Sequence, residues 1–231
     1  MSERTSSREI TIDKTFVAAM YIKNGSGIEI GALHNPMTLP PSARVTYVDR
    51  ISTEELRRMY PEVPQEKIVA VGVVDDGETL ARFGDGTQDF VVANHFLEHC
   101  QNPVGTVIAI DRVLKRGGVA FLSVPDKRYT FDRDREVTTL AHLFDDHLQG
   151  PQSSRSAHYE EYIRAMNKGA EESDIMQMTK QLEDDGYPIH FHVWAQTDML
   201  DLVSALQKVL GFHVECMLRM GIEVVFVLRK Q

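Results

Sequence analysis

Short runs of apolar residues alternate with longer mixed segments along most of the 231-residue chain. This rhythm is typical of a parallel β-sheet whose strands are joined by crossover helices. We therefore expect an α/β fold. The apolar runs predict seven strands, at Gly27–Ile30, Val45–Val48, Ile68–Val73, Asp89–Ala93, Val119–Val124, Phe212–Met217 and Glu223–Leu228.

Capping signals place helices between these strands. Ser52 and Glu55 form a capping box, in which each side chain satisfies a backbone N–H near the start of a helix. A proline in the first turn marks the start of a second helix, and Gly211 closes a third. The expected helices run from Ser52 to about Tyr60, over Pro103–Lys115 and over Thr197–Leu210.

Two segments depart from the alternation. Leu218–Ile222 is too short for a parallel crossover, so the last two strands must form a hairpin that ends the sheet with an antiparallel strand. Residues 126–192 are rich in His, Asp, Arg and Tyr and carry only weak helical stripes. We expect them to form a helical lid that binds the acceptor over the carboxyl edge of the sheet. Residues 1–24 are expected as an N-terminal helical cap, and residues 1–231 as one domain.

Charge and composition limit the partners. A net charge of −9 argues against nucleic acid, since proteins that bind the phosphate backbone usually present a basic surface. No stretch reaches the roughly 18 apolar residues of a membrane span or resembles a signal peptide. Cys100 and Cys216 lack metal-ligand spacing and are expected as free thiols. These features predict a soluble cytoplasmic protein with neither nucleic-acid nor membrane partners. They leave the oligomeric state open, with a homodimer among the alternatives.

Acidic residues follow three of the expected strands. Glu29 ends the first strand, and Asp49 ends the second 20 residues later. An acidic side chain in that position can accept both ribose hydroxyls of a bound nucleoside. Asp75 and Asp76 follow the third strand and could receive the exocyclic amine of adenine. Aspartate is also common in turns for backbone reasons, but three acidic strand ends in register favour a nucleoside site.

The glycine pattern narrows the class of cofactor. After Gly31 the chain reads "ALHNP", so the further glycines of a dinucleotide loop are missing. Dinucleotide sites need them because a pyrophosphate is pressed against the backbone at a helix N-terminus. A cofactor without phosphates needs the backbone to approach it closely at only one position, here Gly31. The pattern therefore favours an adenosine cofactor with a zwitterionic tail over NAD.

A longer motif reads "DFVVANHFLEHCQNPVGTVIAIDRVLKRGGVAFLSVPD", Asp89–Asp126. Its strand, "LEH" turn, helix ending in "RVLKRGG" and strand ending in proline resemble the class I S-adenosylmethionine-dependent methyltransferases of the type 11 group. Arg116 stands where that family usually has proline. The order of motifs matches the family over about residues 25–125. The resemblance implies a Rossmann-like, mostly parallel seven-stranded sheet with helices on both faces, an antiparallel C-terminal strand and a helical lid insertion.

The same resemblance implies S-adenosyl-L-methionine as the cofactor and assigns residues to it by position. The first strand end would hold the methionine amino and carboxylate groups, the second the ribose, and the third the adenine edge. The end of the fourth strand would line the floor beneath the sulfonium. The residues so implied are Glu29, Gly31, Ala32, Asp49, Asp75, Asp76, Asn94 and His95.

Histidines are the candidates for a general base near neutral pH. The segment "HFHVW" places His190 and His192 on one face of an extended segment that returns to the sheet. We expect the base to be one of this pair, with His95 beneath the sulfonium as the alternative. His142, His147 and His158 are less favoured.

The charged part of the insertion has two interpretations. Lys127, Arg128 and Arg133 could face an anionic or hydroxylated acceptor, or the segment could be a solvated lid held by its own ion pairs. A second cluster, His142, Asp145, Asp146 and His147, offers too few oxygen ligands for a hard cation. We therefore predict no metal site.

Three functions remain in competition. The first is an enzyme that methylates a hydroxyl or amine of a small molecule, with a sugar or natural product in a biosynthetic pathway as the first expectation. The second is a non-catalytic regulator or partner subunit that binds S-adenosylmethionine. The third, an NAD-linked oxidoreductase, is disfavoured by the missing glycines. The polar insertion over the reactive edge favours the enzyme.

Overall fold

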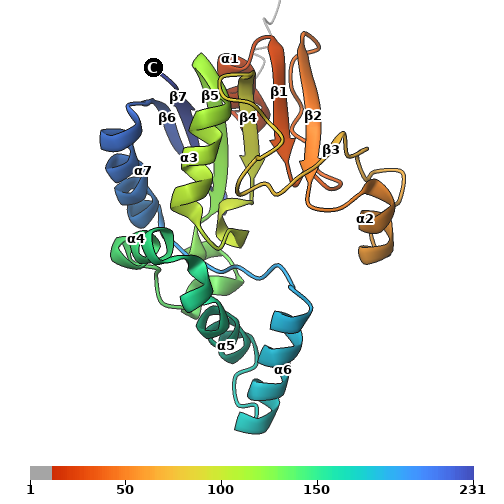
Figure 1. The fold of residues 1–231 in the computed structure, drawn as a ribbon, viewed down its shortest axis with the longest axis vertical. Coiled ribbons are helices and arrows are strands. Elements are labelled where there is room, and N and C mark those ends of the chain that lie inside the picture. The colour runs from red at the N-terminus through yellow and green to blue at the C-terminus, as the bar shows by residue number, and fades with distance from the viewer. Residues whose placement is uncertain (1–11) are drawn as a thin grey trace, which may run out of the picture.

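A computed structural model describes residues 12–231, which are built around a seven-stranded sheet (Figure 1). The strands lie in the order β3-β2-β1-β4-β5-β7-β6. Neighbours from β3 to β5 are parallel, and β7 runs antiparallel between β5 and β6. The predicted fold class and C-terminal hairpin are confirmed. The strands are β1 (Gly25–Ile30), β2 (Ala43–Asp49), β3 (Val73–Val74), β4 (Gln88–Asn94), β5 (Leu114–Pro125), β6 (His213–Met220) and β7 (Glu223–Arg229).

The third predicted strand is the least accurate. Of the run Ile68–Val73, only its last residue belongs to a strand. The rest is held by single hydrogen bonds to other segments: Val69 N–H donates to the carbonyl of Leu33, and Val71 N–H donates to Oγ1 of Thr53. The apolar run therefore anchors a loop, and β3 is a two-residue edge strand.

The predicted helices form with small shifts at their ends. Ser52 and Glu55 make the expected capping box, and Gly211 closes the last helix in a left-handed conformation at φ +74°. The second helix stops two residues early, because the chain enters β5 ahead of the glycine pair. The helices outside the insertion are α1 (Lys14–Tyr21), α2 (Thr53–Met59), η1 (Leu97–His99), α3 (Pro103–Val113) and α7 (Gln196–Leu210).

The two faces of the sheet are covered unequally. Helices α3 and α7 cover one face, where Ile28 and Ile30 of β1 join the larger core cluster. The opposite face packs against α1 and against Met37 from the segment between β1 and β2. That segment, residues 31–42, contains no helix. The chain therefore crosses from β1 to β2 without placing a helix N-terminus beside the first strand end. The first eleven residues of the predicted N-terminal cap lie outside the described part of the chain.

The insertion lies beyond the carboxyl ends of the parallel strands (Figure 1). Its two ends meet, because Asp126 bridges to Trp194 and Lys127 N–H donates to the carbonyl of Trp194. Trp194 is 1% exposed and belongs to the main core. No helix within residues 12–231 is long and apolar enough to cross a membrane. The insertion consists of η2 (Lys127–Tyr129), η3 (Phe131–Asp134), α4 (Leu140–Gln149), η4 (Pro151–Ser153), α5 (Arg155–Met166) and α6 (Glu172–Asp184).

Candidate functional site

A cavity of about 590 Å³ opens between the carboxyl edge of the sheet and the insertion. Its size lies within the range of about 300–1,000 Å³ that is usual for small-molecule sites. One wall comes from β1, β2 and the loop after β3, and the other from α5 and the end of the insertion. The end of β4 and the following turn lie between them. The lining of the cavity includes Gly31, Asp49, Arg50, Asp76, Gly77, His95, Phe96, His99, Arg155, Tyr159, Tyr187 and Phe191.

The ends of β1 and β2 contribute Gly31 and Asp49. Gly31 has φ +65° and donates its N–H to the carbonyl of Val48, so the chain turns sharply as β1 ends. Asp49 is half-buried, and burial raises the pKa of its carboxyl, although the N–H groups of Ile51 and Arg50 oppose that rise. Its carboxyl lines the cavity, in the position predicted for binding the ribose hydroxyls.

The loop after β3 separates its two predicted aspartates. Asp76 lines the cavity, whereas Asp75 accepts hydrogen bonds from the N–H groups of Asp76 and Arg82 and holds the loop. Gly77 lets this loop approach the sheet: a Cβ there would lie 2.6 Å from Cγ2 of Ile30 and from Cζ of Phe96. The geometry therefore offers Asp76 to a ligand and uses Asp75 within the turn.

Glu29 and Asn94 face the other side of the sheet. Glu29 is 1% exposed, accepts from the N–H of Met37 at 2.8 Å and contacts Nδ2 of Asn94 at 3.4 Å. Because side chains alternate along a strand, Glu29 points to the face that α1 covers while its neighbours Ile28 and Ile30 face α3. Neither Glu29 nor Asn94 lines the cavity, nor does Ala32. Direct contact of these three with the cofactor stays a prediction.

Glu29 makes the fold sensitive to pH. Burial raises the pKa of its carboxyl from 4.5 to about 7. Between these values the folded chain holds more protons than the unfolded chain, so the free energy of unfolding falls as pH rises from about 4.5 to about 7. Glu29→Gln removes this loss and should stabilise the fold by up to about 3 kcal/mol above pH 7 relative to the parent chain.

Urea unfolding of the parent chain and the Glu29→Gln variant across this pH range measures the effect. Glu66→Gln, at an exposed position, is the control and should leave the pH profile unchanged. Equal pH slopes for the parent chain and Glu29→Gln would show that Glu29 stays ionised in the fold.

His95 stands at the end of β4 and lines the cavity. Its backbone has φ +47°, a left-handed conformation that is uncommon for residues other than glycine and typical of functional sites. Its Nε2 lies 2.7 Å from the carboxylate of Glu223 at the start of β7, and Lys14 lies 3.3 Å from the same carboxylate oxygen. A carboxylate that accepts from one ring nitrogen fixes the ring and leaves the other nitrogen as an acceptor.

The buried Glu98 stands on the other side of this histidine. Its Oε1 lies 3.6 Å from Nδ1 of His95, and neither of its carboxylate oxygens has a hydrogen-bond partner among the described residues. Burial raises the pKa of Glu98 to about 8, so its carboxyl is largely protonated at neutral pH. Glu223 is therefore the anionic partner of His95. This pair could not be predicted from the sequence, because Glu223 lies 128 residues further along the chain.

The lid side of the cavity is aromatic. Tyr159, Tyr187 and Phe191 line it, and none of them was predicted from the sequence. Arg50 donates to the carbonyl of Gly186 at 3.3 Å, which ties the lid to the end of β2. The residues Lys127, Arg128 and Arg133, which were expected to face an acceptor, do not line this cavity.

His99 is a further cavity histidine that sequence reasoning missed. Its Nδ1 donates to the carbonyl of Ile189 at 2.9 Å, and burial together with the nearby His190 lowers its pKa to about 4. The ring is therefore neutral, with a fixed tautomer.

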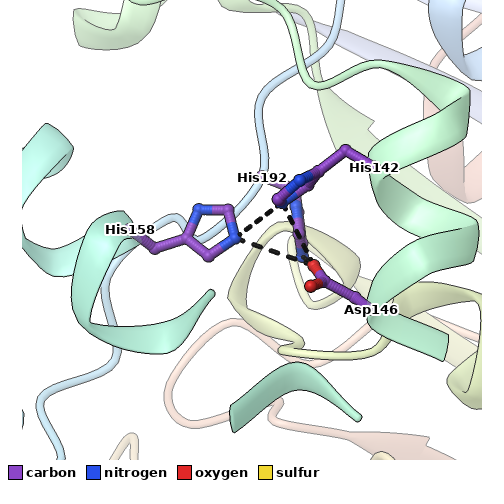
Figure 2. A group of neighbouring side chains, drawn as sticks. All are labelled: His142, Asp146, His158 and His192. Atoms are coloured by element: carbon purple, nitrogen blue, oxygen red, sulfur yellow. Dashed lines mark hydrogen bonds and ion pairs between the residues drawn. The ribbon is translucent and has the colours of Figure 1, made fainter. Parts of the chain in front are cut away.

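The favoured pair of histidines is not at the cavity. His190 donates from Nδ1 to Asp132 at 2.6 Å, and Arg135 donates from Nη1 to the other carboxylate oxygen of Asp132 at 2.7 Å. His192 is completely buried, and its Nε2 lies 3.7 Å from Asp146 (Figure 2). Burial and the neighbouring His158 lower the pKa of His192 to about 3. The extended segment does return to the sheet, but it turns both rings into the insertion and away from the cavity. Of the three predicted bases, the structure brings only His95 to the cavity.

The cavity suits an adenosine cofactor without phosphates. Asp49 and Asp76 line it, and Gly77 lets the loop that carries Asp76 pack closely against Ile30 and Phe96. Residues 31–42 supply no helix N-terminus, the feature that dinucleotide sites use to bind pyrophosphate. The residues present therefore fit S-adenosylmethionine, which has ribose hydroxyls, an adenine amine and a zwitterionic tail.

Comparison with known proteins agrees with this architecture. Residues 24–122 match the family model described as a methyltransferase domain. Among solved structures, the chain is similar to a SAM-dependent methyltransferase from Methanosarcina mazei (16% identity, 93% of this chain and 96% of that chain, TM-score 0.49). It is also similar to the PH0226 protein from Pyrococcus horikoshii (17% identity, 93% and 86%, TM-score 0.52). At 17% identity, the likeness to the Pyrococcus horikoshii protein shows the fold alone. No curated protein matches the chain.

Proposed function

We propose that this chain, whose residues 24–122 are a class I S-adenosylmethionine-dependent methyltransferase domain, methylates a hydroxyl or amine of a small molecule. The observation that supports this proposal most is the composition of one cavity. It joins Asp49 and Asp76 on the cofactor side to the aromatic residues of the insertion, with His95 between them. A small acceptor held on the lid side would lie against the reactive end of the cofactor.

S-adenosylmethionine supplies an electrophilic methyl group when it is bound. Asp49 would accept hydrogen bonds from the ribose hydroxyls, and Asp76 would accept one from the adenine amine. Gly31 permits close approach of the cofactor to the end of β1. The work left to the protein is to align the acceptor with the methyl group and to exclude water. The lid, which Arg50 joins to the end of β2, does both.

His95 is the general base in this proposal. Its Nε2–H donates to Glu223, and Nδ1, which lies 3.6 Å from the carboxyl of Glu98, is the ring nitrogen left to accept a proton. Transfer of the methyl group to a hydroxyl oxygen would break the sulfur–methyl bond, whose electron pair stays on the sulfur of the demethylated product, and the O–H bond, whose proton would pass to Nδ1 of His95. Glu223 is a positioning residue that stabilises the resulting imidazolium. In other enzymes, too, a histidine base that activates a nucleophile is oriented by a third group such as a carboxylate.

The lining of the lid side supports a ring-shaped, hydroxylated acceptor such as a sugar or a natural product. Tyr159, Tyr187 and Phe191 offer flat faces against which a ring can stack. Arg155 adds hydrogen-bond donors at the same wall. We place this activity in a cytoplasmic biosynthetic pathway.

Two readouts separate this function from its rivals. Calorimetry of the full chain should show binding of S-adenosylmethionine and its demethylated product and no binding of NAD. Methyl transfer from labelled cofactor to a panel of sugar and phenolic hydroxyls and amines should then show turnover. Cofactor binding without transfer to any acceptor would favour the regulator or partner subunit. Binding of NAD in place of S-adenosylmethionine would overturn the proposal.

A further inference from the structure

Four side chains converge inside the insertion, away from the cavity (Figure 2). His142 and Asp146 come from α4, His158 from α5 and His192 from the segment that returns to the sheet. Asp146 is 2% exposed and His192 is completely buried, whereas His158 and His142 are 14% and 38% exposed. The cluster therefore has three members that are buried or nearly so and one on the surface side.

The four side chains present one donor atom each to a common point. Nε2 of His142 lies 3.0 Å from Nε2 of His158 and 3.2 Å from Oδ2 of Asp146. Nε2 of His158 and Nε2 of His192 each lie 3.7 Å from that same oxygen. Bonds of about 2.0–2.1 Å to a tetrahedral Zn²⁺ place its ligand atoms about 3.3 Å apart. The observed spacings fall on both sides of this value.

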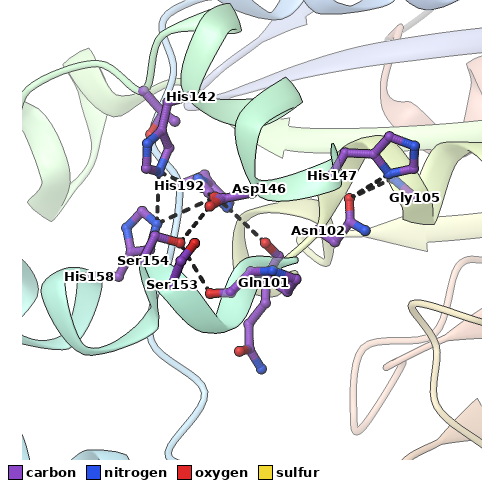
Figure 3. A network of polar contacts seen from close by, with 12 residues as sticks. Gln101, Asn102, Gly105, His142, Asp146, His147, Ser153, Ser154, His158 and His192 are labelled. Carbon is purple, nitrogen blue, oxygen red and sulfur yellow. Dashed lines mark hydrogen bonds and ion pairs between the residues drawn. The ribbon is translucent and has the colours of Figure 1, made fainter. Parts of the chain in front are cut away.

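Hydrogen bonding within the protein does not account for the arrangement. Oδ2 of Asp146 is buried and has no hydrogen-bond partner within residues 12–231, while Oδ1 accepts from Ser154 at 2.5 Å (Figure 3). Nε2 of His192 has one alternative, the carbonyl of Gln101 at 3.4 Å, which is long for a hydrogen bond. Nε2 of His142 and Nε2 of His158 lie within hydrogen-bond distance of each other, but Oδ2 of Asp146 meets the three imidazoles only at ion-pair distances of 3.2, 3.7 and 3.7 Å. A buried carboxylate oxygen without a hydrogen bond is unusual, because such groups are costly to leave unpaired.

We propose that His142, Asp146, His158 and His192 bind one divalent transition-metal ion, with Zn²⁺ preferred, through three Nε2 atoms and Oδ2 of Asp146. Imidazole and carboxylate ligands in this number suit Zn²⁺, whereas Mg²⁺ and Ca²⁺ need more oxygen ligands. Four protein ligands close the coordination sphere, so the ion is structural. This reverses the prediction that the chain has no metal site. Of the cluster considered in the sequence, Asp145 and His147 take no part.

A metal here would join three separate segments of the insertion, namely α4, α5 and the extended segment at His192. It would fix these segments against one another. Tyr159 and Phe191, each next in sequence to a ligand, line the cavity. The ion would therefore set the shape of the lid wall that faces the acceptor. This inference does not depend on the proposed function, because the four ligands lie outside the cavity.

Metal content of the purified full chain tests the proposal directly. Mass spectrometry of the metals should find about one Zn²⁺ per chain. After removal with a chelator, calorimetry should show uptake of one Zn²⁺, and Co²⁺ should give the intense visible bands of a four-coordinate site. No bound metal as purified, together with no uptake of Zn²⁺ or Co²⁺ by the folded apo chain, would overturn it. These readouts measure the metal and not methyl transfer, so they fail or succeed independently of the proposed function.

Variants on one helix provide the matched comparison. His142→Ala removes the most exposed ligand and should weaken Zn²⁺ binding at least about 100-fold. His147→Ala lies on the same helix but contacts Asn102, and should bind as the parent chain does. Circular dichroism checks that both are folded. Equal affinity in the two variants would contradict the site.

Cysteine at the same position keeps the test decisive if the alanine variant does not fold. Thiolate is also a good zinc and cobalt ligand, so His142→Cys should bind one Co²⁺ and gain a thiolate-to-cobalt band in the near ultraviolet. A folded His142→Cys chain that binds Co²⁺ without this band would show that position 142 does not touch the metal.

Discussion

Replacing His95 by alanine is expected to lower turnover by about 10²–10⁴-fold while S-adenosylmethionine still binds. The loss would follow from the removal of the proposed proton acceptor, which lines the cavity next to the end of β4. The ring is not part of the hydrophobic core, so the variant should fold. Single-turnover kinetics with labelled cofactor measures the chemical step, and calorimetry measures cofactor affinity.

Three comparisons decide whether His95 acts as the base. Imidazole added in solution should restore part of the activity of His95→Ala. Glu223→Gln should lower kcat with little change in KM, since in the proposed role Glu223 orients the ring and stabilises its protonated form without contacting the substrate. His213→Ala, at an exposed histidine that begins β6, should be fully active. Full activity of His95→Ala would mean that alignment alone suffices or that the proton leaves through another residue.

The parts of the fold that depend on local signals could be predicted from the sequence. The capping box at Ser52, the glycine stop at Gly211 and the short connection between the last two strands each act over a few residues. The apolar run at Ile68–Val73 was the exception. An apolar run without alternation does not show whether a strand or a loop carries it, and here only Ile68 of the run is buried.

Side-chain direction could not be predicted to the same extent. The sequence placed Asp75 and Asp76 together after a strand, but only the folded turn separates the one that holds the loop from the one that lines the cavity. Glu29 matched a family motif, yet the alternation of side chains along β1 turns it toward Met37. A motif gives the position of a residue along a strand, while register and the preceding turn decide where its side chain points.

The insertion was the hardest segment to predict because its contacts are distant in sequence. His192 reaches Asp146 and His158, each more than thirty residues earlier, so no short window contains the cluster. The same holds for Arg135, which is 3% exposed and joins Asp132 to Glu161. Charged residues at irregular spacing look like a solvated surface in the sequence. Here they form buried networks, whose members stabilise one another only after folding.

The second large effect is expected at the cofactor. Asp49→Ala should weaken binding of S-adenosylmethionine by about tenfold or more, because two charge-assisted hydrogen bonds to the ribose are each worth roughly 1.5–3 kcal/mol. Folding should be affected far less. Burial raises the pKa of the Asp49 carboxyl, so the fold itself does not favour its charge. Calorimetry gives the affinity, and urea unfolding gives the stability.

Asp75→Ala is the matched control, since it removes an equal charge from the adjacent loop without removing a group that lines the cavity. Its carboxylate accepts from two backbone N–H groups, so its loss should destabilise the fold by about 1 kcal/mol and change cofactor affinity less than Asp49→Ala does. Asp49→Ala should therefore lower mainly the affinity for the cofactor, whereas Asp75→Ala should lower mainly the free energy of unfolding. An unchanged dissociation constant in a folded Asp49→Ala chain would remove Asp49 from the cofactor site, and the ribose would then have to be held from the loop at Asp76.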